Sequence, residues 1–107
     1  MNKEEYIKAE KALKEEFEKK RKQLAREFAY SNNPVKIGDI ITDHYKTIRV
    51  EKLVYGRNFG YTFPCMFYYG TRLNKKGEPA KRNTDANRVA QTDIREINGR
   101  PYKYELE

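Results

Sequence analysis

The stretch Ser31-Asn32-Asn33-Pro34 divides this chain into two parts of different character. Residues 1–31 contain no Gly and no Pro, whereas all six Gly and all four Pro fall at or after Pro34. Gly and Pro interrupt helices and favour turns, so this distribution predicts one uninterrupted helix followed by a turn-rich segment. Either Asn can adopt the left-handed conformation that ends many helices, and Pro34 prevents continuation. We therefore expect a helix over residues 1–33 and a β domain over residues 34–107.

The predicted helix carries large apolar residues on one narrow face. Their successive spacings of 7, 4, 7 and 4 residues place them within roughly 60° of one another at about 100° per residue. These residues are Tyr6, Leu13, Phe17, Leu24 and Phe28. Asn2 and Glu5 have the spacing of a capping box, which predicts the start of the helix. A helix of this length spans ~40 Å, more than the width of a domain of about 75 residues, so the β domain can cover only part of this face.

The second part of the chain alternates β-rich runs with turn residues. Strands are predicted over residues 36–41, 47–55, 61–73, 88–92 and 101–106. A turn is predicted over 75–78, a helical turn over 93–97, and Asn98-Gly99 is a strong hairpin signal. In the longest run, alternation buries Cys65 and Phe67 and turns Met66, Tyr68 and Arg72 outward. The sequence therefore predicts an α+β fold, with a long N-terminal helix followed by a small antiparallel β-barrel of about five strands.

Three features of the β domain resemble the SH3-like small barrels, which include KOW- and Tudor-type modules. They are the entry into the first strand at Gly38-Asp39, the strand pair that follows, and the turn over 93–97 before a closing strand. The resemblance covers roughly residues 35–106. It implies a fold that binds RNA, DNA, ribosomal proteins, peptides or modified side chains. The chain has no Trp, unlike the SH3 domains that bind proline-rich peptides, and a shared fold does not by itself specify the ligand.

The sequence offers few groups for catalysis or metal binding. With one Cys and one His, the chain can form neither an internal disulfide nor a structural zinc site. Cys65 is expected in the core beside Phe67, and His44 in an exposed turn. The acidic residues are dispersed, and no Gly-rich phosphate loop is present. We therefore expect no enzyme activity, no metal and no cofactor.

Two further patterns bear on where the protein works. A lone cysteine is typical of a reducing compartment, so we expect a cytoplasmic protein. No apolar run approaches the ~18 residues of a membrane span, so we expect no membrane partner.

The positive charge of the chain points to a polyanionic partner. The formal net charge is +7. Residues 1–31 contribute +2, from nine Lys/Arg and seven Glu, and residues 32–107 contribute +5, from fourteen Lys/Arg and nine Asp/Glu. Basic side chains beside an exposed aromatic ring suit a phosphate backbone with unpaired bases. The expected nucleic-acid-binding residues are Arg72, Lys75, Lys76, Lys81, Arg82, Arg88 and Tyr68.

Two functions follow from these surfaces, and the sequence leaves both open. The first is a non-enzymatic module that binds nucleic acid through the basic loop over residues 72–88. The second is a protein-interaction adaptor, or a homodimer, that uses the apolar helix face. A charged hairpin tip can also be merely solvated, and a helix face can pack within its own chain. Salt-sensitive binding would implicate the loop, and salt-insensitive binding the helix.

Overall fold

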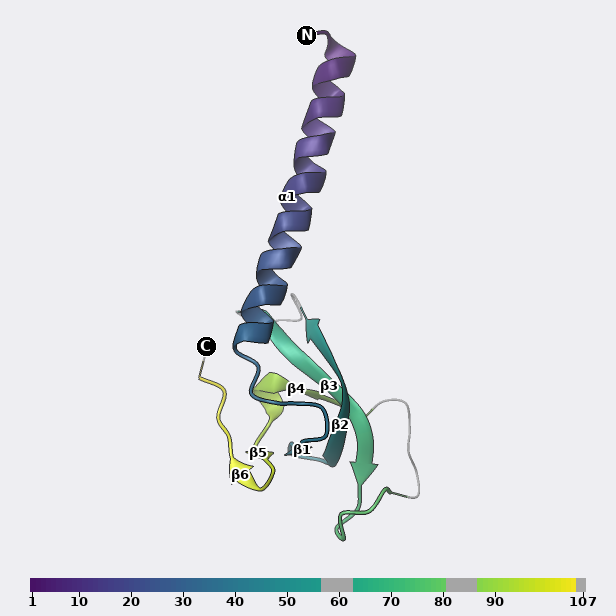
Figure 1. Cartoon of the computed structure of the whole chain (residues 1–107), viewed down its shortest axis with the longest axis vertical. Helices are drawn as coiled ribbons and strands as arrows, with labels where there is room; N and C mark the ends of the chain where they lie inside the picture. The colour runs from purple at the N-terminus through teal and green to yellow at the C-terminus, as the bar shows by residue number, and fades with distance from the viewer. Residues whose placement is uncertain (57–62, 81–86, 106–107) are drawn as a thin grey trace.

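The computed structural model of the chain describes residues 1–56, 63–80 and 87–105. The molecule is elongated, with principal extents of 69 × 29 × 21 Å. Its long axis follows the N-terminal helix, which projects from one end of an antiparallel sheet (Figure 1). The α+β architecture expected from the sequence is confirmed.

Helix α1 spans Lys3–Ser31. The backbone N–H of Glu5 donates to Asn2 Oδ1 at 2.8 Å, which confirms the predicted N-cap. At the other end Asn32 has a φ of −104° and Asn33 has no positive φ either, so the expected left-handed ending at one of these residues is wrong. Instead, the backbone N–H and the side-chain amide of Asn32 both donate to the Phe28 carbonyl, at 3.2 and 3.0 Å. The side chain caps the helix end without a strained backbone.

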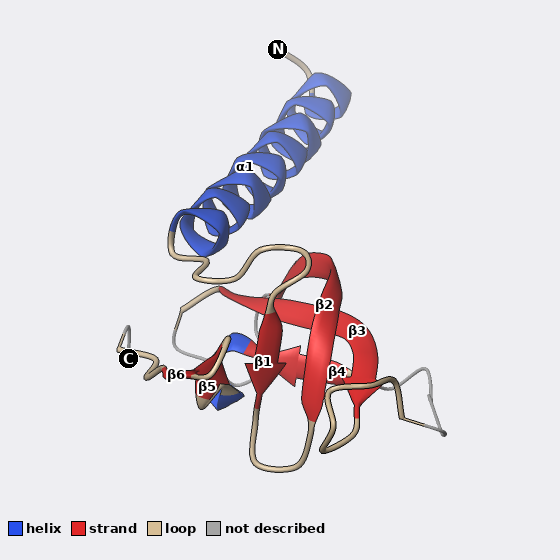
Figure 2. Cartoon of the chain, turned by 60° about the horizontal axis from the view of Figure 1, so that its bottom comes forward, coloured by secondary structure: helices blue, strands red, loops and turns tan. Residues whose placement is uncertain are grey.

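The β domain is built on a six-stranded sheet (Figure 2). The strands are β1 Ile40–Thr42, β2 Thr47–Gly56, β3 Cys65–Leu73, β4 Arg88–Ala90, β5 Glu96–Ile97 and β6 Arg100–Pro101. Their order across the sheet is β4-β3-β2-β1-β5-β6, and every neighbouring pair is antiparallel. The long β2–β3 pair forms the centre of the sheet, with a register irregularity between Val50 and Lys52.

The end of the β domain differs from the sequence prediction. The turn expected over 93–97 is a 3-10 turn, η1, at Gln91–Asp93, and residues 96–97 form strand β5 instead. The strand expected over 101–106 is reduced to β6, and residue 106 lies outside the described residues. The hairpin at Asn98-Gly99 is confirmed, because both residues have positive φ, 52° and 78°, as a type I′ turn requires. Across the described residues β4 and β6 remain the edges of the sheet, so the expected closed barrel is not found.

Strand β3 is buried on both faces along its first half. One face belongs to the main core, which contains Ala29, Val35, Ile41, Ile48, Val50, Met66, Tyr68, Val89 and Ile94. The other face forms a small second cluster of Cys65, Phe67 and Ala90. The predicted burial of Cys65 is confirmed, but the outward placement of Met66 and Tyr68 is wrong. The run over 65–69 is apolar throughout, and a strand covered on both faces gives no alternation from which to choose the solvent side.

The helix meets the sheet through its last two turns. Within α1 only Ala25 and Ala29 are buried, and the Phe28 ring stacks on Phe63 with centroids 5.6 Å apart. Asn33 Oδ1 accepts hydrogen bonds from the Val35 backbone N–H at 3.0 Å and from the Tyr68 hydroxyl at 2.6 Å.

A buried glutamine on η1 completes this junction. Gln91 Nε2 donates to the Asn32 carbonyl at 2.9 Å, and Gln91 Oε1 accepts from the Met66 backbone N–H at 3.0 Å. Since Asn32 ends the helix and Met66 lies in β3, one side chain ties three parts of the fold together. These bonds connect the end of α1 to β3.

Candidate functional site

A tight turn between β1 and β2 holds Tyr45 in solvent. Asp43 Oδ1 accepts hydrogen bonds from the backbone N–H groups of Tyr45 at 2.7 Å and Lys46 at 2.8 Å. The Asp43 backbone N–H donates to the Lys46 carbonyl at 3.0 Å, which closes the turn. Asp43 itself is buried, whereas Tyr45 is 86% exposed. The turn therefore fixes an aromatic ring that contributes little to the core.

A second ordered turn follows β3 and carries two lysines. Asn74 Oδ1 accepts from the backbone N–H groups of Lys76 and Glu78, at 2.9 and 3.0 Å. The Asn74 backbone N–H donates to the Glu78 carbonyl at 2.7 Å, and Gly77 provides the positive φ of 79°. The turn predicted over 75–78 is thus confirmed. The backbone of Lys75 and Lys76 therefore belongs to a hydrogen-bonded turn, from which their side chains extend.

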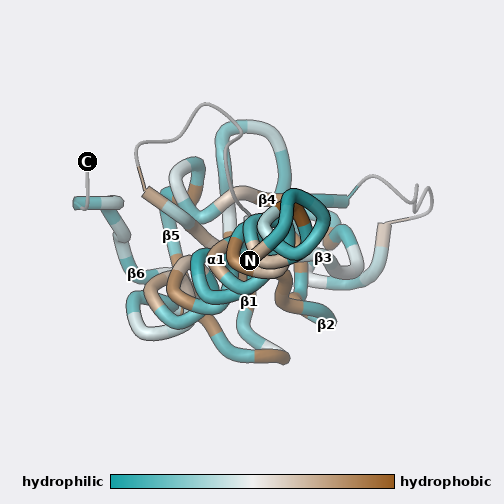
Figure 3. The backbone as a smooth tube through the Cα atoms, turned by 90° about the horizontal axis from the view of Figure 1, so that it is seen from above, coloured by the Kyte–Doolittle hydropathy of each residue, from teal (hydrophilic) through white to brown (hydrophobic). Residues whose placement is uncertain are grey.

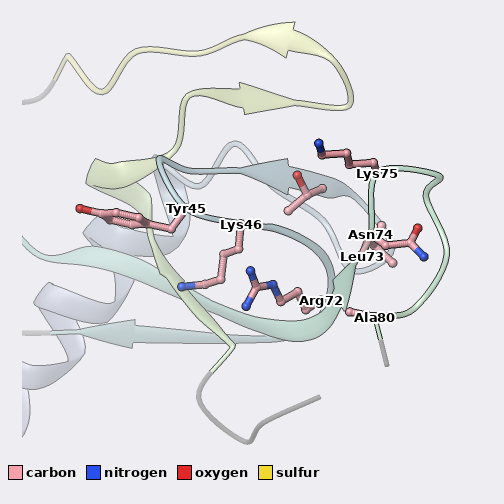
Figure 4. Close-up of a pocket in the computed structure, with 8 residues that line it drawn as sticks. Tyr45, Lys46, Arg72, Leu73, Asn74, Lys75 and Ala80 are labelled. Carbon is pink, nitrogen blue, oxygen red and sulfur yellow. The ribbon is translucent and has the colours of Figure 1, made fainter. Parts of the chain in front are cut away.

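The two turns flank a hollow of about 480 Å³, which we call the basic groove. It is lined by Tyr45, Lys46, Thr47, Arg72, Leu73, Asn74, Lys75 and Ala80. Three of these side chains are cationic and none is acidic. Figure 4 shows the Lys46 and Arg72 side chains extending toward the side of the groove where the Tyr45 ring lies. The Ala80 backbone N–H donates to the Arg72 carbonyl at 2.8 Å, so the returning chain forms one wall.

The cations of the groove are weakly neutralised within the described part of the chain. Lys46 Nζ lies 3.6 Å from Asp43 Oδ2, on the carboxylate that also holds the turn. Neither Arg72 nor Lys75 pairs with a described carboxylate. Like charges that line one hollow repel each other, and an anionic ligand would relieve that repulsion.

The structure brings together only part of the predicted basic set. Arg72 and Lys75 line the groove, and Lys76 is exposed on the same turn. Arg88 pairs with Tyr69 across the β3–β4 ladder, on the opposite face of β3 from Arg72. Its guanidinium lies 5.0 Å from the centre of the Phe67 ring. The other two predicted cations, Lys81 and Arg82, lie outside the described residues.

The prediction that Tyr68 is exposed and can stack on a base is wrong. Its side chain is fully buried, with 0% exposure, and its hydroxyl donates to Asn33. Burial raises the pKa of the Tyr68 hydroxyl far above its ordinary range. The ring available for stacking is Tyr45, which follows His44 in the exposed turn and is not among the residues predicted to bind. The position of Tyr45 in the sequence could have indicated this exposure, because the tip of a tight turn between two strands lies away from the core.

The apolar face of the helix is exposed for most of its length. Tyr6, Leu13, Phe17 and Leu24 are 58%, 66%, 63% and 68% exposed, and we call these four residues the apolar helix stripe. The fifth predicted member, Phe28, is half-buried against Phe63. In Figure 3, seen from the N-terminal end, the helix is largely hydrophilic with a few hydrophobic segments. The β domain thus covers the end of the predicted face and leaves the rest open.

The chain matches no protein-family model, no curated protein and no solved structure. Within the described residues, no three His, Cys, Asp or Glu side chains are grouped to hold a metal ion. No helix in that part of the chain has the length and apolarity to cross a bilayer.

Proposed function

We propose that this protein is a non-enzymatic binding module that recognises single-stranded nucleic acid through the basic groove. The observation that carries the proposal is Tyr45, an 86% exposed ring that a hydrogen-bonded turn holds beside Lys46 and Arg72. Stacking of an unpaired base on an aromatic ring contributes about 1–3 kcal/mol. Lysine and arginine beside the ring supply the phosphate contacts that orient the strand.

The dimensions and charge of the groove suit a nucleotide unit. Its volume of about 480 Å³ lies within the ~300–1,000 Å³ typical of small-ligand sites. All of the charged residues that line it in the described part of the chain are cations, and the Asp43 carboxylate accepts hydrogen bonds within the turn that presents Tyr45. A single strand is favoured over a duplex because bases paired in a duplex cannot stack on Tyr45.

Two features support an SH3-like small barrel as the framework of this site. The 3-10 turn η1 precedes β5, and β5 returns to pair with β1, so the last part of the chain comes back to the first strand. The sheet is open in the described residues, so the SH3-like barrel is part of this proposal.

The test is binding of a fluorescein-labelled oligo-dT, followed by anisotropy at several salt concentrations. Three phosphate contacts predict a slope of log K against log salt of about −2 for a single strand. Y45A should weaken binding roughly 5- to 100-fold, and R72Q/K75Q should flatten the slope by about 1.4.

Matched controls remove equivalent groups elsewhere. Tyr30 is exposed on the helix, and Arg95 and Lys103 are exposed in the β domain. Y30A and R95Q/K103Q should leave affinity and slope close to those of the unmodified protein. Absence of binding at 50 mM salt, or equal losses in the groove and control variants, would contradict the proposal.

The apolar helix stripe supports a second candidate function, a protein-interaction adaptor. Four large apolar side chains, each more than half exposed, lie on one face of a helix that the β domain contacts only at its end. A contiguous exposed apolar surface marks an interaction site. Binding through this surface would depend little on salt, unlike binding through the groove.

A further inference from the structure

We infer that a second copy of this chain covers the apolar helix stripe, in an antiparallel pair with its twofold axis at residue 15. The inference uses the same surface as the adaptor function proposed above and specifies its partner. Residues 1–24 are all exposed, so the stripe is free along its whole length. Three properties of this segment select a second copy: the symmetry of the apolar positions, the symmetry of the charges, and the area available.

The apolar positions are symmetric about residue 15. Tyr6 and Leu24 lie nine residues on either side of it, and Leu13 and Phe17 lie two residues on either side. In an antiparallel pair centred there, Tyr6 packs against Leu24 of the second copy and Leu13 against its Phe17. Every stripe residue meets another stripe residue, which is the self-complementarity that a twofold interface needs.

The spacing of the stripe also allows two helices to remain in contact. Tyr6 and Phe17 are eleven residues apart, as are Leu13 and Leu24. An eleven-residue repeat corresponds to about 3.67 residues per turn, close to the 3.6 of a straight α-helix. Two nearly straight helices can therefore keep their stripes together over this length.

The charged residues beside the stripe have the same symmetry with opposite signs. At 100° per residue, the charges within about 80° of the stripe centre include three pairs that are equidistant from residue 15. These pairs are Lys3 with Glu27, Glu10 with Lys20, and Lys14 with Glu16. In the antiparallel pair Glu10 lies diagonally across the seam from Lys20, as Lys3 does from Glu27, and Arg21 of the second copy also approaches Glu10. Lys14 and Glu16 lie beside the twofold axis at the edge of the seam, where each is nearest to its own copy, so the complementarity rests on the other two pairs.

A parallel arrangement lacks this complementarity. In a parallel, in-register pair every flanking residue meets itself, so Glu10 faces Glu10 and Lys20 faces Lys20. Like charges brought together across an interface oppose association. The flanking charges are exposed and already form pairs along the helix, Glu16–Lys20 at 3.0 Å and Glu10–Lys14 at 3.9 Å. They therefore select the orientation of the pair more than its strength.

The area and the position of the β domain are compatible with such a pair. Four exposed side chains of this size bury roughly 1,000 Å² in a dimer, near the lower limit of specific interfaces, so we expect micromolar affinity. Ala25 and Ala29, which contact the sheet, lie about 100° and 140° around the helix from Tyr6. The β domain thus sits beside the stripe, and the pair places the two β domains at opposite ends.

The test begins with sedimentation equilibrium of the full chain. The unmodified protein should show a concentration-dependent dimer in the micromolar range. L13E should weaken dimerisation at least about tenfold, because it introduces a charge into the apolar seam. I7E is the matched control, since Ile7 is a 54% exposed apolar residue of the same helix that points about 100° away from Tyr6. Near-ultraviolet circular dichroism verifies that the β domain stays folded in both variants.

Charge reversal tests the orientation. E10K should weaken the dimer roughly three- to tenfold, because the substituted side chain would bring a positive charge against Lys20 and Arg21 of the second copy. E10K/K20E/R21E should restore dimerisation. In a parallel pair E10K would merely exchange one self-facing charge for another and change little.

A spin-label distance tests the register. Labels attached through K3C should lie about 36 Å apart in the antiparallel pair, because 24 residues separate positions 3 and 27 at ~1.5 Å per residue. A strict monomer at high micromolar concentration would overturn this inference while leaving an adaptor with a different partner in place. A dimer unaffected by L13E, or a label separation below about 15 Å, would also overturn it.

Discussion

Strand β3 and the N-terminal two thirds of α1 carry similar apolar side chains, yet only the strand buries them. Met66 and Tyr68 are fully buried, whereas Leu13 and Phe17 are about two thirds exposed. Both segments show their apolar residues in the sequence, one as a continuous run and one as a stripe. The difference arises because β3 lies between β2 and β4 with core on both faces, while α1 extends beyond the sheet (Figure 1). The pattern of apolar residues identifies an apolar surface, and the tertiary structure decides whether the same chain buries it.

The largest contrast should come from truncating one large residue in each segment. Y68A should lower the free energy of unfolding by about 3–5 kcal/mol, because it opens a cavity and removes the hydrogen bond to Asn33. L13A should change the stability of the monomeric β domain by less than about 0.5 kcal/mol. Urea unfolding at submicromolar concentration, below the range in which the proposed dimer forms, measures both. Equal effects would mean that the stripe is covered within the monomer.

Alkaline unfolding should report the burial of Tyr68 directly. Burial raises the pKa of Tyr68 in the folded state, whereas in the unfolded chain it is about 10. Below pH 10 both states keep the proton, so Tyr68 adds no pH dependence. Above pH 10 only the unfolded state loses it, and stability should fall by about 1.4 kcal/mol per pH unit.

Two substitutions separate Tyr68 from the other tyrosines in that measurement. Y68F should remove the contribution of Tyr68 to the alkaline slope. Y45F is the control and should leave the slope unchanged, because Tyr45 is 86% exposed. An unchanged slope in Y68F would show that another group controls alkaline unfolding.

A substitution at the junction between α1 and the sheet should lower the free energy of unfolding by less than Y68A does. Q91L removes the hydrogen bond that Gln91 donates to the Asn32 carbonyl and the one that it accepts from the Met66 backbone N–H. Leaving these buried groups unpaired should cost about 1–3 kcal/mol, and hydrogen exchange should increase at the end of α1. T92V is a control on the same 3-10 turn, because the Thr92 hydroxyl has no hydrogen-bond partner among the described residues. A loss in T92V as large as in Q91L would argue against the role of Gln91.

Local signals in the sequence determined the helix, its N-cap at Asn2 and the hairpin at Asn98-Gly99. Each depends on interactions between residues close together in the chain, such as the Glu5–Asn2 hydrogen bond or the positive φ values of the hairpin. The extent of β2 was also close to that predicted, because it is a long β-rich run bounded by turn residues. Strand β3 ends at residue 73 as predicted but begins at Cys65 instead of residue 61; residues 63–64 are not part of the strand, and residues 61–62 lie outside the described residues. The sequence also identified the apolar helix stripe, because the spacing of apolar residues along a helix decides which of them share a face.

The tertiary structure alone decided the surroundings of these elements. It placed Tyr68 in the core beside Asn33, which is 35 residues earlier in the chain, and it brought Tyr45 and Lys46 to Arg72 and Lys75 in one groove. Such pairings depend on strand order and on which elements cover each face, and alternation along a single strand contains neither. The sequence by itself determined where apolar and basic surfaces lie along the chain. Only the packing of the strands and the direction of α1 decided which of these surfaces remain exposed to a partner. The reason is that the exposure of a residue depends on which other elements pack against it.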